Sequence, residues 1–137
     1  MKLVFSIVIM FMFLMGNAQE KSKLIIDFEL VKHKIGKLYV AVYNSEESFL
    51  KEAMTGMILE INNGKAMAVF DNLDYGTYAV SSFYDKNDNG KLDTNFLGIP
   101  KEPTAMSNNA KGSFGAPKFK DAKFVFSSIN NTIKIKF

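Results

Sequence analysis

The sequence has no cysteine among its 137 residues. This absence excludes disulfide bonds, thiolate catalysis, zinc–thiolate sites and iron–sulfur clusters. It also excludes the lipid-modified N-terminal cysteine of a lipoprotein. A domain of about 120 residues folds without disulfides or a structural metal, and the 13 Phe and 5 Tyr residues supply apolar side chains for its core.

Arginine is also absent, because all 17 basic residues are lysine. Guanidinium groups are the usual readers of phosphates and base edges. The lysines are scattered singly among 14 acidic residues, and the net charge is only +3. These features argue against nucleic-acid binding.

Long apolar runs are confined to the N-terminus, where residues 3–15 are apolar except for Ser6. This run of about 13 residues is shorter than the roughly 20 that a membrane-spanning helix needs. A basic residue precedes it, and Gly16 and Ala18 follow it as the small residues of a cleavage site. The layout predicts a signal peptide over residues 1–18. We therefore expect an exported protein, periplasmic or extracellular, with one domain over residues 19–137 and no transmembrane segment in the mature chain.

The mature chain consists mainly of short runs in which apolar and polar residues alternate. Such alternation indicates strands with one buried face. Strands are expected at residues 23–30, 36–43, 57–61, 65–70, 77–84, 122–127 and 132–137. Asn63 and Gly64 lie between two of these runs and tolerate the positive φ of a tight hairpin. The alternation stops over residues 44–56, where we expect a short helix or a loop.

About seven short strands with little helix favour an all-β fold, namely an antiparallel β-sandwich with one long ordered loop. The expected sandwich is immunoglobulin-like. A small closed barrel is the alternative.

Residues 85–122 form the long loop, and connections of more than about 12–15 residues are usually functional or disordered. This one is neither low in complexity nor highly charged. We expect it to be ordered, because it contains apolar side chains that would pin it onto the sheet: Phe96, Leu97, Ile99, Met106, Phe114 and Phe119.

The start of this loop has the oxygen spacing of a calcium loop, with a glycine, Gly90, at position 6. Position 12 is Phe96, so the bidentate Glu of an EF-hand is missing. The spacing predicts a Ca²⁺ site made of Asp85, Asn87, Asn89, the Lys91 carbonyl and Asp93. In the alternative interpretation, the Asp and Asn residues form Asx-turns at the end of a strand.

Several short motifs follow one another along residues 78–122. They are Tyr78-Ala79-Val80, FYDKNDNGKLDTN at 83–95, LGIP at 97–100, SNNA at 107–110 and FGAPKFKDA at 114–122. Over residues 22–137 the chain thereby resembles the domain-of-unknown-function 2141 family. Residues 101–106 depart from the Gly- and aromatic-containing approach expected before Ser107. The resemblance implies an exported small β-sandwich, similar to prealbumin-like or carboxypeptidase-regulatory-like domains, and implies no activity.

These features favour a non-enzymatic domain that binds an unknown ligand or an envelope protein through its long loop, with Ca²⁺ ordering residues 85–95. The single histidine, His33, lies beside a turn among lysines and leaves no evident base for a serine nucleophile. One alternative is a hydrolase whose acids, Asp85, Asp93 and Asp121, would have to converge in a pocket. Another is a component of a cell-envelope assembly, which would expose an apolar patch or a sheet edge.

Overall fold

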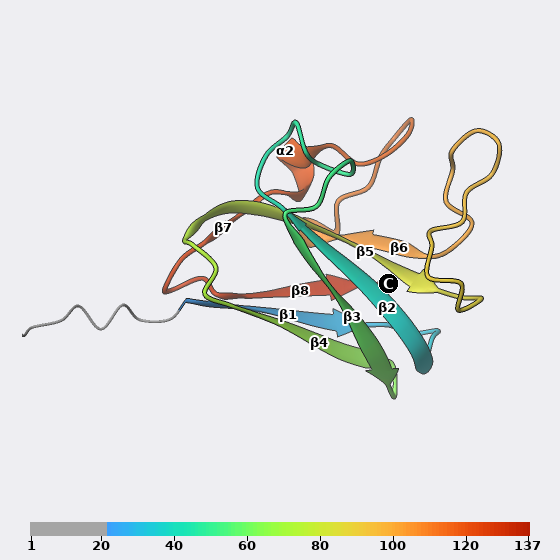
Figure 1. Ribbon diagram of the computed structural model, residues 1–137, viewed down its shortest axis with the longest axis horizontal. Helices are drawn as coiled ribbons and strands as arrows, with labels where there is room; N and C mark the ends of the chain where they lie inside the picture. Colours follow the sequence, from blue (N-terminus) through green and yellow to red (C-terminus); the bar gives the residue numbers. More distant parts are fainter. Residues whose placement is uncertain (1–21) are drawn as a thin grey trace, which may run out of the picture.

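The structure is a computed structural model that describes residues 22–137, so the predicted signal peptide lies outside the described residues. The described chain contains eight strands and two short helical segments. In order they are β1 (Lys23–Glu29), β2 (Ile35–Tyr43), β3 (Thr55–Asn62), β4 (Lys65–Asp71), β5 (Gly76–Asp85), β6 (Thr104–Met106), the 3₁₀ turn η1 (Ser107–Asn109), α2 (Phe119–Ala122), β7 (Phe124–Phe126) and β8 (Thr132–Lys136). The expected all-β fold is confirmed (Figure 1).

Each of the seven expected strands is present, with ends that differ by a few residues. The hairpin between β3 and β4 is also confirmed, because Asn63 and Gly64 have φ angles of 49° and 75°. Residues 44–54 form a loop that contains a single helix-like turn, in which the Glu52 N–H donates to the Ser48 carbonyl.

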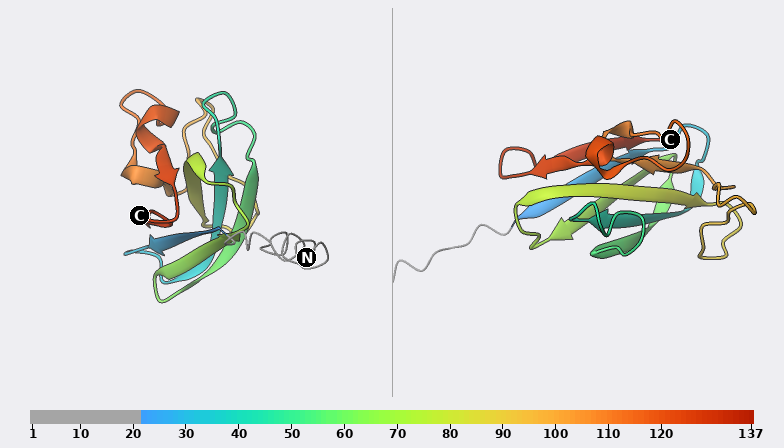
Figure 2. Two further views of the ribbon diagram at one scale, coloured as in Figure 1. Left: turned by 90° about the vertical axis from the view of Figure 1, so that its left-hand side faces the viewer. Right: turned by 90° about the horizontal axis from the view of Figure 1, so that it is seen from above.

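The strands form one mixed sheet rather than the expected antiparallel sandwich. Their order is β6-β5-β2-β3-β4-β1-β8, and β7 pairs separately with β5. Strand β8 lies parallel to β1, with Ile135 beside Phe28. The last strand, β8, also contacts β6 at the other end of the order, so the sheet curls until it nearly closes (Figure 2). The small closed barrel is therefore the better description of this fold.

The parallel pair explains why local patterns did not predict this closure. Hairpins join neighbouring strands in antiparallel fashion, whereas β1 and β8 come from the two ends of the described chain. The fifth strand in sequence, β5, pairs with β2 over residues 79–85 and with β7 over residues 76–78. The final two strands consequently do not pair with each other.

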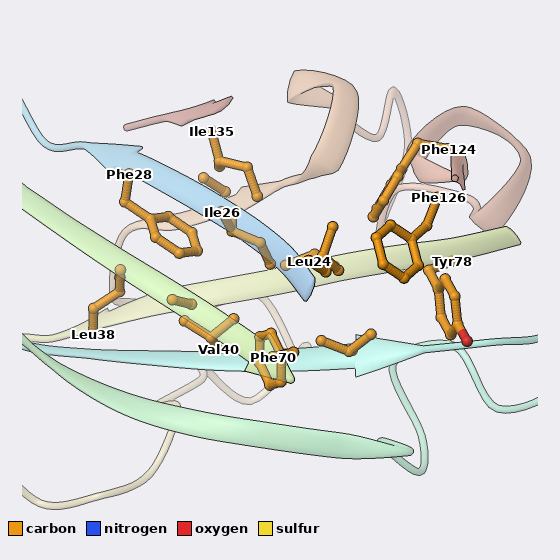
Figure 3. Packing of buried hydrophobic residues seen from close by; sticks show 14 of the residues in the cluster. Leu24, Ile26, Phe28, Leu38, Val40, Phe70, Tyr78, Phe124, Phe126 and Ile135 are labelled. Atoms are coloured by element: carbon orange, nitrogen blue, oxygen red, sulfur yellow. The ribbon is translucent and has the colours of Figure 1, made fainter. Parts of the chain in front are cut away.

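The core lies inside the curled sheet and is lined by the inward-facing residue of each alternating pair (Figure 3). Phe126 from β7 is fully buried and packs edge-on against Tyr78, with ring centroids 6.2 Å apart. The Tyr78 hydroxyl donates a 2.6 Å hydrogen bond to the Asp74 carbonyl. Burial of this phenol, with a smaller effect of the Asp74 charge, raises the pKa of Tyr78 above its ordinary value.

Most of the apolar residues of the long loop do not pin it to the sheet as expected. Met106 is buried and Phe119 packs against a small outer cluster. In contrast, Phe96 and Phe114 are fully exposed, and Leu97 and Ile99 are more than half exposed. Short regular segments that the sequence did not predict (β6, η1 and α2) hold this loop instead.

We predict that Phe126→Ala destabilises the protein by about 3–5 kcal/mol, because it leaves a cavity beside Tyr78. The matched control is Val125→Ala in the same strand, where the side chain is 60% exposed. That change should cost less than about 0.5 kcal/mol. Urea denaturation measures both values, and equal effects would contradict the placement of β7 against the core.

Candidate functional site

A groove of about 930 Å³ lies on the outer face of β2 and β5. Its volume falls within the range of about 300–1,000 Å³ that is typical of small-molecule sites. Two segments of the long loop, residues 92–100 and 110–117, stand beside this face and contribute its walls. Both segments project beyond the sheet in the upper part of Figure 1. The groove is larger than a second pocket of about 710 Å³ that lies beside β1, β4 and β8.

The floor of the groove comes from the outward-facing positions of two paired strands. Leu38, Val40 and Val42 point into the core, so the alternate residues of β2 face outward. Tyr39 of β2 lies opposite Phe83 of β5, and their rings stack with centroids 4.9 Å apart. Strand alternation thus places an aromatic platform outside the core.

The walls are apolar and mostly exposed to solvent. One wall carries Leu92, Leu97, Ile99 and Pro100, and the other carries Ala110, Gly112, Gly115, Ala116 and Pro117. Asn95 stabilises a turn in the first wall, because its Oδ1 accepts the N–H groups of Leu97 and Ile99 at 2.9 and 3.0 Å. Because apolar side chains on a soluble surface are stabilised by being covered, this arrangement suits an apolar ligand.

A second, smaller core holds the wall at residues 110–117 against the sheet. Tyr43 contacts Phe49 edge-on, and Phe49 contacts Phe119 of α2 in the same way. Ser107 links this region to β5, because its buried hydroxyl accepts the Val80 N–H at 2.9 Å and donates to the Ala122 carbonyl at 2.5 Å. The wall at residues 110–117 therefore lies between two segments that are held against the sheet.

The wall at residues 92–100 is anchored by Asp85, the last residue of β5, which is 3% exposed. Its Oδ1 accepts the Asn89 N–H at 3.2 Å, and its Oδ2 accepts the Gly90 N–H at 2.8 Å. Gly90 has φ of +76°, as the sharp bend predicted at this position requires. The carboxylate therefore closes the turn at residues 85–90. The Asn89 side chain bonds the backbone two residues on, at the Lys91 N–H, as the Asx-turn interpretation expects.

Glu102 is a second buried anchor, and it is 6% exposed. Its carboxylate accepts the Lys86 N–H at 2.8 Å and the Asp93 N–H at 3.1 Å. Glu102 belongs to residues 101–106, to which the sequence assigned no role. It thus joins the two ends of the segment at residues 86–93. Sequence analysis missed Glu102, since its only signal is a single acid between Lys101 and Pro103.

Three of the predicted metal ligands come together at the surface of this loop. The Asp93 carboxylate accepts the side-chain N–H of Asn87 at 2.7 Å and that of Asn89 at 3.0 and 3.1 Å. The Asp85 oxygens accept the backbone N–H groups of Asn89 and Gly90, and the Asn89 Oδ1 accepts the Lys91 N–H at 2.9 Å. Over residues 22–137 no group of three or more His, Cys, Asp or Glu side chains gathers in metal-binding geometry.

The tip of the loop also contacts β2 through an ion pair. Lys37 Nζ lies 2.7 Å from Asp88 Oδ1. The hydrogen bond and the negative charge of Asp88 raise the pKa of Lys37 above its ordinary value. Both side chains remain exposed, so this contact positions the loop more than it stabilises the fold.

The three acids of the hydrolase alternative do not line the groove or the other shallow pocket described within residues 22–137. Asp85 caps a turn, Asp93 faces two amides, and Asp121 lies in the single turn α2. His33 stacks on the Tyr84 ring, with centroids 4.1 Å apart.

The fold and the groove define a small all-β domain with a loop-walled apolar groove and a carboxylate-anchored loop. The chain belongs to the DUF2141 family, described as uncharacterized proteins conserved in bacteria, whose family model matches residues 26–134. No match was found among curated proteins or among solved structures. Over the described residues, none of the helices has the length and hydropathy to span a membrane.

We predict that Asp85→Ala destabilises the protein by about 1–3 kcal/mol, because the Asn89 and Gly90 N–H groups lose their charged acceptor. Asp85→Asn keeps one acceptor oxygen and should have a smaller effect. The control is Asp88→Asn, which removes an exposed charge and suits the positive φ of that position. Urea denaturation should rank the three losses of stability in that order, and equal losses for Asp85→Ala and Asp88→Asn would refute the anchoring role.

Proposed function

We propose that this protein is an exported, non-enzymatic binding domain that takes an apolar ligand, or an apolar part of an envelope partner, into the groove between residues 92–100 and 110–117. The observation that carries the proposal is the groove itself, with its floor of stacked Tyr39 and Phe83 rings. Apolar pockets with few polar groups are the usual form of small-molecule sites.

The exposed side chains of the walls support the same function. Leu97 is 68% exposed and Ile99 is 55% exposed, although each lies beside a well-ordered turn. A soluble domain of this size gains nothing in its own stability from apolar side chains in that position. Covering them with a ligand removes apolar area from water, at about 25 cal/mol per Å².

We predict that the neutral fluorescent probe N-phenyl-1-naphthylamine binds the groove. Phe83→Ala should weaken this binding roughly fivefold to tenfold, because one ring of the stacked floor is lost. Ile129→Ala is the control, since Ile129 is exposed and lies outside the groove. Fluorescence titration measures the affinities, and circular dichroism checks that the Phe83 variant is folded. A protein that does not enhance the probe's fluorescence would contradict the proposal.

We also propose that Ca²⁺ orders residues 85–95. The convergence of Asn87, Asn89 and Asp93 supports this part, because three oxygen-bearing side chains meet at one point. A cation there would require both amides to turn Oδ1 toward Asp93 in place of Nδ2. Asp85 would remain a second contributor, since each of its oxygens keeps a lone pair after accepting a backbone N–H.

Thermal melts in millimolar Ca²⁺ and in EDTA test the metal site. With a dissociation constant near 0.1 mM, Ca²⁺ should raise Tm by about 5 °C. Asp93→Asn should remove this shift, whereas Asp88→Asn should keep it. Asp93 is a better probe than Asp85, whose loss destabilises the loop with or without a cation. Identical melting curves in Ca²⁺ and EDTA would exclude the site.

Export rests on the leader pattern of residues 1–18, which lie outside the described residues. N-terminal sequencing of the protein after expression of the full chain in a bacterium should give Gln19 as the first residue. Recovery of the intact Met1 form in the cytoplasm would contradict export.

A further inference from the structure

We infer that the groove selects amphiphiles that have an apolar chain and one anionic head group, and that Lys111 binds the head group. This inference rests on the proposed binding function and adds the chemical class of the ligand. It depends on the distribution of charge around the groove.

The residues that line the groove include one side chain with a formal charge at neutral pH, Lys111, and no Asp or Glu. Lys111 is exposed and takes part in none of the ion pairs found within residues 22–137. A solvent-exposed ammonium without a protein counter-ion next to an apolar surface suits a carboxylate, sulfate or phosphate group whose chain lies on that surface.

The other polar groups of the groove do not favour a sugar or another neutral polyol. Ser81 Oγ and the Tyr43 hydroxyl lie 3.2 Å apart and hydrogen-bond each other. The remaining side chains with hydroxyl groups belong to Tyr39, Thr94 and Thr104, and Phe83 lies between Tyr39 and Thr104 across the strands. Tight binding of a polyol would need several paired donors and acceptors, because each unpaired polar group that is buried costs free energy.

A cationic amphiphile is disfavoured by charge. The walls, residues 92–100 and 110–117, contain one lysine, Lys111, and one acid, Asp93, which does not line the groove. A positive head group would therefore meet the positive charge of Lys111 and no carboxylate in the lining. The loop at residues 44–54 carries Glu46, Glu47 and Glu52, but its only contribution to the groove is the apolar Leu50.

The tips of both walls extend the apolar surface beyond the groove. Phe96 follows the lining residue Thr94 by two positions, and Phe114 lies between Gly112 and Gly115. Both rings are almost completely exposed, at 94% and 106%.

Isothermal titration with three single-chain compounds below their micellar concentrations tests the inference. The compounds are dodecanoate, dodecanol and dodecylamine, which share the chain and differ in the head group. Dodecanoate should bind about tenfold more tightly than dodecylamine. Lys111→Gln should weaken dodecanoate binding about fivefold and leave dodecanol unchanged, and Lys111→Glu should reverse the preference between dodecanoate and dodecylamine. Lys134→Gln, a change on β8 outside the groove, is the matched control.

The outcomes separate this inference from the proposed function. Equal affinities for the three compounds, with no effect of Lys111→Gln, would overturn the selection for anions and leave the apolar groove intact. Failure of all three compounds to bind would overturn both. Vesicles of phosphatidylglycerol form a further arm, in which binding to vesicles without binding to dodecanoate monomers would overturn the assignment of a single-molecule ligand.

Discussion

The site depends on one constraint, which is that the backbone N–H and C=O groups of a long connection need hydrogen-bond partners. Strand pairing within this connection supplies few of them. Between β5 and β7 the chain makes only the three-residue strand β6 and two short turns, so many N–H groups need other acceptors. Asp85, Glu102 and Ser107 supply them from buried positions. These three side chains hold the loop walls in place, and the groove exists only because the walls stand where they do.

This dependence explains why polar groups are buried while apolar groups are exposed in the same segment. A carboxylate inside the protein is tolerated because its oxygens accept backbone N–H groups, as those of Asp85 and Glu102 do. The apolar side chains of Leu97 and Ile99 are then free to face outward from a turn that does not need them for stability. The exposed apolar surface of the groove and the stability of the loop therefore depend on different residues.

Strand β5 connects the two roles. Its inner face packs Tyr78 and Val80 into the main core, and its outer face presents Phe83 to the groove. Because Ala79 on that outer face belongs to the second, smaller core, the same strand also supports the loops. Its closing residue Asp85 begins the oxygen-rich turn, so a cation bound there would act directly on the wall at residues 92–100.

The sequence by itself determined the features that depend on local periodicity. Alternation in residues such as Leu38, Val40 and Val42 predicted the strands, and Asn63-Gly64 predicted a hairpin because both residues adopt positive φ. The position of the oxygen-rich loop after β5 was equally local. The family resemblance was confirmed by the match over residues 26–134, since an ordered series of motifs is a property of the sequence alone.

Only the tertiary structure decided how the sheet closes and what the long loop does. The parallel pairing of β1 with β8 joins residues more than a hundred positions apart, so no local pattern specifies it. The same holds for Glu102, whose role comes from the N–H groups of Lys86 and Asp93 that the fold brings to it. An apolar residue in a loop can pack inward or line a groove, and side-chain hydrophobicity is the same in both cases. Burial of Met106 and exposure of Phe96 were therefore settled by the arrangement of the strands around them.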